Sequence, residues 1–143
     1  MTDLETAIII ADVKRFFDSM TGFSEKALSA AFLECYNNSP DFLAFSNDGI
    51  MRHYDEFKQI CTGYYDRLKQ QRIETIQEKF RVIDKNLVIV GWTGNIVADF
   101  KNGDTLKMKG YAVTYLFKRI DNTWKVIHSH ESSPPPEFIK KAH

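Results

Sequence analysis

The segment Trp124–Ser133, with the sequence WKVIHSHESS, is the part of the chain that decides the fold. It reads as a β-strand, because it follows the polar turn Asp121-Asn122 and stops at three prolines that begin with Pro134. Side chains two residues apart lie on one face of a strand, so His128 and His130 share a face. A strand that begins with a large apolar anchor and ends in two imidazoles and a carboxylate can point titratable groups into a hollow. The segment therefore predicts a pocket.

Glu131 lies on the opposite face from His128 and His130 if the strand is regular, so the three side chains cannot all line one cavity. The apolar residues Trp124 and Val126 favour burial of the histidine face. A β-bulge would change which side chains share a face, and the sequence does not indicate one. His128, His130 and Glu131 are therefore all candidate catalytic residues.

Three interpretations of the two histidines stay open. An acid/base role in a pocket suits an imidazole near a carboxylate, because such a group titrates close to neutral pH. A structural role would have each imidazole hydrogen-bonded to a neighbouring strand or helix end. A metal site would need a third ligand that converges on the pair, such as His53 or Asp99, and nothing in the sequence demonstrates that convergence. We therefore predict neither a metal nor a cofactor.

Three long segments before this strand also have the pattern of β-strands and are joined by tight turns. The strongest turn signal is Asn102-Gly103, because these residues tolerate the positive φ that hairpin turns require. Strands in hairpin order form an antiparallel sheet, and strands of this length must twist and curl. Bulges or sharp bends are expected at Gly91, Gly94 and Gly110. The expected strands are residues 72–83, 87–100, 105–119 and 124–133.

The first half of the chain has helical periodicity. Apolar residues recur at steps of three and four in three segments, which gives each helix one apolar face. Thr21-Gly22 is expected to end the first helix, and Ser24 to cap the second. A short strand is expected at residues 41–46. The expected helices are residues 3–20, 25–37 and 54–68. The fold class is therefore α+β, with three N-terminal helices packed on a strongly curved antiparallel sheet that forms a cone with a central pocket.

Length and charge bound the possible functions. The chain of 143 residues fits one domain, expected at residues 1–133, with a C-terminal tail at residues 134–143. Its 19 basic and 19 acidic residues cancel and are interleaved, so neither nucleic acid nor a membrane surface is an expected partner. No apolar stretch approaches the ~20 residues of a membrane span, and acidic residues follow Met1 where a secretory signal would carry positive charge. A soluble, cytoplasmic protein is therefore expected.

The chain is rich in aromatic residues, with 11 Phe, 6 Tyr and 2 Trp. Such an excess indicates a bulky core, a lined cavity or an oligomer interface. Tyr64, Trp92 and Tyr115 are candidate ligand-binding residues of a cavity wall, and packing alone also explains them. Cys35 and Cys61 are expected to be buried thiols, because their spacing supports neither a disulfide nor a metal site.

The order of these elements resembles the nuclear transport factor 2-like superfamily. The specific part of the resemblance is GYAVTYLFKR at residues 110–119, followed by WKVIHSHESS at residues 124–133. Within the superfamily, the chain is most similar to SnoaL-like and ketosteroid-isomerase-like domains, and it also resembles the association domain of calcium/calmodulin-dependent kinase II. The resemblance implies a deep pocket between the helices and the concave face of the sheet, and dimerisation through the convex face.

The sequence departs from these relatives at positions that carry chemistry. Tyr115 and Glu131 stand where the kinase association domain has pocket arginines, so a site built to hold a carboxylate is not expected. Ser46 or Asn47 stands where steroid isomerases place a general-base Asp, with Asp48 slightly later. Phenylalanine replaces their tyrosine donor on the first helix. Steroid isomerisation is therefore not expected.

Two functions of different classes remain. The first is a small-molecule-binding domain, with acid/base chemistry of the isomerase, dehydratase or cyclase type on a small apolar or carbonyl compound. The second is a non-catalytic, homo-oligomerising association module whose cavity is vestigial. In both cases a homodimer through the sheet is expected, because long strands that are apolar on both faces need a second cover. The two functions differ in the cavity itself: an open pocket with His or Glu inside favours the first, and a hollow plugged by Phe and Tyr favours the second.

Overall fold

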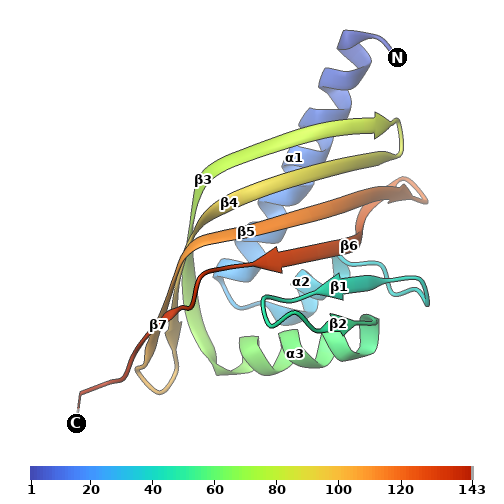
Figure 1. The fold of residues 1–143 in the computed structure, drawn as a ribbon. Coiled ribbons are helices and arrows are strands. Elements are labelled where there is room, and N and C mark those ends of the chain that lie inside the picture. Colours follow the sequence, from blue (N-terminus) through green and yellow to red (C-terminus); the bar gives the residue numbers. More distant parts are fainter. Residues whose placement is uncertain (143) are drawn as a thin grey trace.

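The computed structural model describes residues 1–142 and confirms the expected fold, with helices packed on one side of a long, curved, open sheet (Figure 1). In the described part of the chain, the elements are α1 (Asp3–Glu25), α2 (Ser29–Glu34), β1 (Leu43–Phe45), β2 (Met51–Arg52), α3 (Tyr54–Arg67), β3 (Leu68–Asp84), β4 (Leu87–Phe100), β5 (Thr105–Ile120), β6 (Thr123–Ser132) and β7 (Glu137–Ile139). None of the helices among these residues is long and apolar enough to cross a lipid bilayer.

The strands form one sheet in the order β2-β1-β6-β5-β4-β3, and β7 pairs with β5. The four long strands pair in antiparallel hairpin order, as expected. β1 differs, because it pairs with β6 in parallel. The segment before β1 already runs alongside β6: Asn37 N donates to Val126 O at 2.9 Å, and Val126 N donates to Cys35 O at 2.8 Å. The chain therefore enters β1 in the same direction as β6.

The helix α1 is longer than the sequence predicts. It begins with a capping box between Thr2 and Glu5 and ends at Glu25, beyond the expected stop at Gly22. Ser24, expected to cap the second helix, is a buried residue inside the first. A glycine inside a helix costs about 1 kcal/mol relative to Ala, and burial of Phe17, Met20 and Ser24 offsets that cost. The helical prediction was therefore right in kind and wrong at this boundary.

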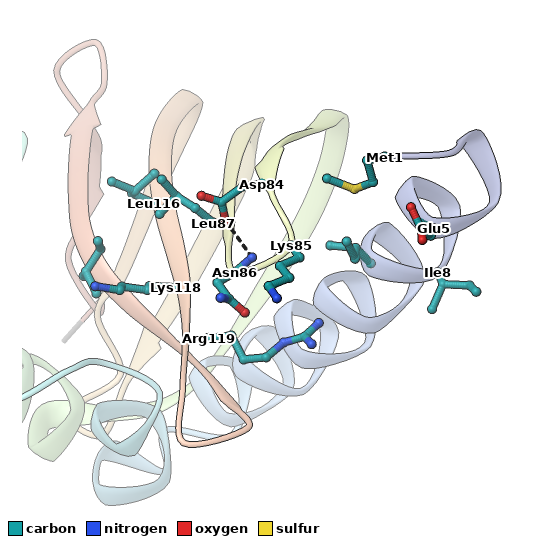
Figure 2. A pocket seen from close by; sticks show the side chains of 12 residues that line it. Met1, Glu5, Ile8, Asp84, Lys85, Asn86, Leu87, Leu116, Lys118 and Arg119 are labelled. Carbon is teal, nitrogen blue, oxygen red and sulfur yellow. Dashed lines mark hydrogen bonds between the residues drawn. The ribbon is translucent and has the colours of Figure 1, made fainter.

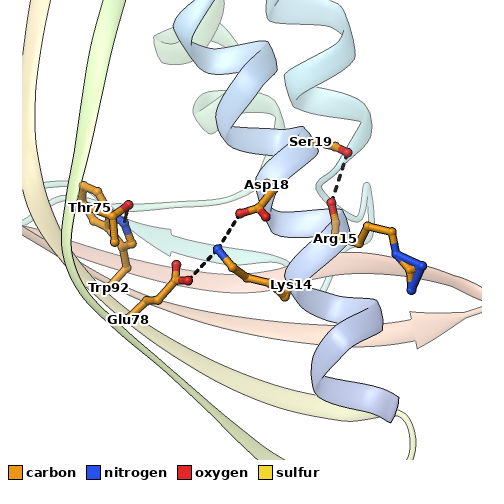
Figure 3. Close-up of polar contacts among 7 residues, drawn as sticks. All are labelled: Lys14, Arg15, Asp18, Ser19, Thr75, Glu78 and Trp92. Atoms are coloured by element: carbon orange, nitrogen blue, oxygen red, sulfur yellow. Dashed lines mark hydrogen bonds and ion pairs between the residues drawn. The ribbon is translucent and has the colours of Figure 1, made fainter. Parts of the chain in front are cut away.

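The core lies between α1 and the concave face of the sheet. The rings of Phe17 and Phe117 lie 6.0 Å apart, and the ring of Phe16 meets that of Phe117 edge-on at 5.8 Å. A polar contact joins the same two layers at the surface: Lys14 Nζ lies 2.7 Å from Asp18 on its own helix and 2.6 Å from Glu78 on β3 (Figure 3). These contacts fix the distance between the helix and the sheet, and so the depth of the space between them.

The long strands bend together (Figure 1), and two glycines, Gly94 and Gly110, interrupt their regular geometry. Gly110 has a φ of +70°, and the pairing of β4 with β5 shifts beside it, where Gly110 N donates to Asn95 Oδ1 at 3.1 Å. Gly94 leaves room for a ring, since a Cβ atom there would lie 2.5 Å from the indole of Trp92. Bends were expected at both positions. At Gly91, where a bend was also expected, the pairing is regular on both sides.

The last ten residues contain a short strand. Glu137–Ile139 pairs with Thr105–Lys107 of β5, and its side chains are exposed. Lys141 N donates to Asp104 Oδ1 at 2.9 Å, which ties the segment to the β4–β5 turn. Within the expected tail, Glu137–Ile139 therefore lies along the sheet, and His143 lies outside the described residues.

Candidate active site

A bulge in β6 decides which side chains reach the concave face. Leu116 pairs with His128 and the next residue, Phe117, pairs with Val126, so Ile127 is an extra residue on β6. Beyond Ile127 the side chains alternate again, but each points to the face opposite to the one it would have in a regular strand. Ser129 is 1% exposed and therefore lies on the same, inner face as Val126. Glu131 follows it inward, and the two histidines face outward.

The inner face of the sheet, α1 and α3 enclose a cavity of about 730 Å³. That volume lies within the range of small-molecule sites, roughly 300–1,000 Å³. Most of its wall is apolar, and eight of its side chains are aromatic. The aromatic side chains of the wall are Phe17, Phe32, Phe57, Tyr64, Tyr65, Trp92, Tyr111 and Tyr115. The aromatic excess of the sequence therefore lines an open hollow as well as filling the core.

Glu131 places a carboxyl group in the wall of this cavity. Its Oε2 accepts a hydrogen bond from the Tyr111 hydroxyl at 2.5 Å. Burial raises the pKa of Glu131, and the negative charge of Asp48 raises it further; the Tyr111 hydrogen bond and the Arg52 charge act in the opposite direction. Glu131 therefore holds its proton more firmly than an exposed carboxyl group does, which suits an acid/base role.

The three candidate ligand-binding residues all line the cavity. Tyr64 comes from α3, Trp92 from β4 and Tyr115 from β5. The Trp92 Nε1 donates to Thr75 Oγ1 at 2.9 Å, which fixes the indole against the wall (Figure 3). Burial, and then the charge of Glu131, raises the pKa of Tyr115, so its hydroxyl stays protonated. The structure thus brings these rings together around one space with Glu131.

A chain of hydrogen bonds crosses the wall on the side of α1 and α3. The Tyr64 hydroxyl donates to Gln71 Oε1 at 2.8 Å, and Gln71 Nε2 donates to Ser24 Oγ at 2.6 Å. The same Ser24 oxygen lies 2.7 Å from the Tyr65 hydroxyl. Every buried side-chain polar atom among residues 1–142 has a hydrogen-bond partner. These hydrogen bonds therefore satisfy the polar groups of the wall without adding charge to it.

Two charged residues meet beside the cavity. Asp48 lines it, and its two carboxylate oxygens accept from Arg52 at 3.1 and 2.7 Å. These hydrogen bonds to Arg52, with a further bond from Ile50 N, lower the pKa of Asp48 to about 2. Asp48 is therefore an ionised partner of Arg52, and its chemistry differs from that of Glu131.

His128 and His130 lie on the outer face of the sheet, away from the cavity. His128 Nδ1 lies 2.8 Å from the carbonyl oxygen of Leu43, and the ring of His130 lies 4.8 Å from that of Phe45. Both imidazoles border a shallow depression of about 580 Å³ with Thr114 and other outer residues of β3–β6. The bulge at Ile127 is the reason, because it reverses the alternation that a regular strand would give. The three candidate catalytic residues are therefore split between the two faces.

A wider hollow lies at the far end of the sheet, between α1 and the β3–β4 turn (Figure 2). Its volume is about 1000 Å³, and its side chains include Met1, Ile8 and Leu87. Its carboxylates, Glu5 and Asp84, are exposed, so it lacks a shielded carboxyl group such as the half-buried Glu131 of the inner cavity. We therefore place the candidate site in the inner cavity.

Tyr111 and Gln71 are the site residues that the sequence interpretation missed. For Tyr111 a signal existed: it alternates with Val113, Tyr115 and Phe117, so it shares their face once Tyr115 is assigned to the cavity. For Gln71 the expected strand began one residue too late, because β3 follows α3 without a break at Leu68.

A protein-family model described as the SnoaL-like domain matches residues 2–136. The chain belongs to the SnoaL-like family. No curated protein matches it. The matched segment covers every element from α1 to β6, so the whole cavity of this SnoaL-like domain lies within the family's shared region.

Solved structures share the fold at low sequence identity, and nuclear transport factor 2-like proteins are among them. One is a protein from Novosphingobium aromaticivorans provisionally named scytalone dehydratase, with a TM-score of 0.83, 6% identity, and coverage of 99% of this chain and 94% of that chain. Hexachlorocyclohexane dehydrochlorinase LinA-type3 from Novosphingobium barchaimii has a TM-score of 0.75, 10% identity, and coverage of 99% and 97%. A provisionally named calcium/calmodulin-dependent kinase II association domain from Xanthomonas campestris has a TM-score of 0.72, 15% identity, and coverage of 87% and 86%. At these identities the likeness concerns the fold.

Proposed function

We propose that this SnoaL-like domain binds a small, largely apolar molecule in the inner cavity and that Glu131 exchanges a proton with it. The observation that carries the proposal is a carboxyl group with a raised pKa in the wall of an otherwise mostly apolar, aromatic cavity of about 730 Å³. Pockets of this size and composition, with few polar groups, are typical of small-molecule sites. A perturbed titratable group inside one is typical of acid/base catalysis.

A carbonyl compound suits this arrangement. Protonated Glu131 can donate a hydrogen bond to a carbonyl oxygen, and ionised Glu131 can accept a proton from the carbon beside it. Tyr111 holds one carboxyl oxygen at 2.5 Å and leaves the other free to meet the ligand. Isomerisation, dehydration and cyclisation each need such a proton transfer. The chemistry of the site thus fits these three reaction types without selecting among them.

The binding half of the proposal is tested with naphthyl methyl ketone, a neutral aromatic ketone whose binding is followed by fluorescence. Leu106 lines the cavity and is only partly exposed, so Leu106→Trp is expected to fill the space and abolish binding. Leu4→Trp is the matched control, because Leu4 is 71% exposed on α1 and does not line the cavity. Binding that survives Leu106→Trp, or is lost equally in both variants, would contradict the proposal.

The chemical half is tested by hydrogen–deuterium exchange at the methyl group of the same ketone, measured by NMR. The wild-type protein is expected to accelerate exchange, and Glu131→Gln to reduce that acceleration at least ~10-fold, since a positioned general base typically contributes roughly 10²–10⁴-fold. Glu56→Gln, at an exposed residue of α3, serves as the control. If the wild type and Glu131→Gln exchange the methyl protons equally fast, Glu131 is not the base.

The non-catalytic association module is less well supported. It requires a hollow plugged by aromatic side chains, whereas the rings here surround open space. Glu131 also has no structural ion pair in the described part of the chain that would explain a carboxyl group at this depth. Small-molecule binding explains both observations.

We also propose that two copies of the chain dimerise through the outer face of β3–β6. The helices pack on the other side of the sheet (Figure 1), and this face carries the half-buried Ala112 and Leu116 beside His128. An uncovered sheet face with apolar residues is a surface that a second copy can bury. The two histidines would then contact the partner copy instead of the ligand.

Thr114→Arg is expected to convert the dimer to a monomer. Thr114 is exposed and lies opposite His130 in the middle of this face, so an added charge there would be buried without a partner in a dimer. Thr123→Arg, at an exposed residue where β6 begins, is the matched control and should leave the dimer intact. Light scattering measures both masses. A monomeric wild type at micromolar concentration would overturn the proposal.

A further inference from the structure

The carboxyl group of Glu131 has no positively charged partner in the described part of the chain. Its Oε2 accepts from Tyr111, and its Oε1, which is still accessible to solvent, has no hydrogen-bond partner among residues 1–142. No lysine, arginine or histidine of the described chain forms an ion pair with it. An ionised carboxylate removed from water is costly unless positive charge or several donors meet it. Glu131 lines the cavity, so a cationic ligand bound there can supply the compensating charge.

Two guanidinium groups at the site, those of Arg52 and Arg67, have partners other than Glu131. Arg52 is bound by both carboxylate oxygens of Asp48. Arg67 lines the cavity, but its Nε donates to Gly63 O at 3.2 Å and its guanidinium carbon lies 5.7 Å from the centre of the Phe100 ring. Asp48 and Arg52 pair with each other and Arg67 is exposed to solvent, so among the charged residues of the described wall Glu131 is the one that is half-buried and has no ion pair.

The aromatic wall favours the same sign of ligand charge. The face of an aromatic ring carries negative electrostatic potential, which attracts cations and repels anions. Eight such side chains surround the space beside Glu131, and Trp92, Tyr111 and Tyr115 come from strands next to it or one strand away. The charge of Glu131 already raises the pKa of Tyr111 and Tyr115, so a second negative charge would be strongly disfavoured.

We propose that the cavity accepts a hydrophobic organic cation, a protonated amine carried on an aromatic or aliphatic ring system. The ammonium group would bind the free Oε1 of Glu131, and the ring would pack against the aromatic wall. This inference rests on the proposed function, because it assigns a ligand class to the same cavity. A hydroxyl in place of the ammonium would supply one hydrogen bond and no charge, and a carboxylate would place two negative charges side by side.

Three probes of nearly equal shape test the inference: naphthylmethylamine, naphthylmethanol and naphthoate. Affinities for the full chain are measured by calorimetry at neutral pH. The amine is expected to bind at least about tenfold more tightly than the alcohol, the scale of one desolvated cation–π or charge-assisted contact. Naphthoate is expected to bind most weakly. Glu131→Gln should remove the preference for the amine and change the affinity for the alcohol by less than threefold, roughly. Glu137→Gln, at an exposed residue of β7, should keep the preference.

Each other outcome overturns the inference. Equal binding of amine and alcohol to the wild type would mean that Glu131 selects no charge. Tightest binding of naphthoate would mean that the site carries positive potential. A preference for the amine that persists in Glu131→Gln would place the cation elsewhere. If naphthyl methyl ketone binds and the amine does not, only the ligand class fails. If neither binds, the proposed function fails as well.

Discussion

Replacing Trp124 by Ala is expected to lower the free energy of unfolding by about 3–5 kcal/mol, the usual cost of removing a large buried aromatic side chain. Trp124 is 5% exposed and joins β6 to α1, because its Nε1 donates to Asp12 Oδ2 at 3.1 Å. The guanidinium carbon of Arg119 lies 4.7 Å from the centre of its ring. A loss of this size is a large part of the roughly 5–15 kcal/mol that holds a domain folded. Urea denaturation followed by circular dichroism measures it.

Two controls separate packing from polar contacts. Trp124→Phe keeps most of the buried area and loses the bond to Asp12, so it is expected to cost about 1 kcal/mol for that bond, plus a smaller loss of packing. His130→Ala, at an exposed side chain on the outer face, should change stability by less than about 0.5 kcal/mol. If His130→Ala in the isolated monomer unfolds the protein as readily as Trp124→Ala does, the histidine is a structural support of the fold.

Replacing Glu131 by Gln is expected to stabilise the fold at neutral and alkaline pH. Burial raises the pKa of Glu131 above its ordinary value of 4.5. Between that value and the folded-state pKa, the folded protein binds more protons than the unfolded chain, so stability falls as pH rises. The loss is complete above the folded-state pKa. Its slope cannot exceed about 1.4 kcal/mol per pH unit, the value for one proton. Gln does not titrate, so the variant should lack this decline.

Asp48 acts in the opposite direction and in a separate pH range. Its hydrogen bonds to Arg52 lower its pKa from 3.8 to about 2, so the stability that it contributes is lost as pH falls through that interval. A series of urea titrations from acidic to alkaline pH distinguishes the two groups. The acid limb should be the same in wild type and Glu131→Gln, and the limb above 4.5 should differ. Parallel curves across the whole series would show that Glu131 titrates as an exposed carboxyl group.

The periodic pattern of apolar residues predicts the fold, but it does not predict which side chains form the site. Alternating strands, the Asn102-Gly103 turn and three amphipathic helices are local patterns, and each formed where expected to within a few residues. Which face of β6 meets the cavity depends on the single extra residue Ile127, whose conformation is set by pairing with β5 and has no signature in its own side chain. Reasoning from strict alternation therefore groups His128 with Val126, and the structure separates them.

The partners of Glu131 show the same limit. Tyr111 lies twenty residues before Glu131 and on a different strand, and only the register of β5 against β6 brings the two together. Gln71 meets Ser24 because α1 continues past Gly22 and carries Ser24 to β3. Both contacts depend on tertiary packing, and the second also overrides the local helix stop at Thr21-Gly22. The aromatic wall can be predicted from the sequence, because the prediction depends only on composition and on the alternation of side chains along the strands.

The number of residues in β6, more than their identity, decides which side chain points into the cavity. Beyond the bulge the side chains alternate between the two faces, so removal of Ser129 would turn His130 toward the cavity and Glu131 toward the outer surface. Removal of Ile127 would restore a regular strand and leave Glu131 facing inward. Single-residue insertions and deletions can therefore exchange a carboxyl group for an imidazole in this scaffold with no substitution anywhere in the wall, a direct route to redesigning its acid/base chemistry.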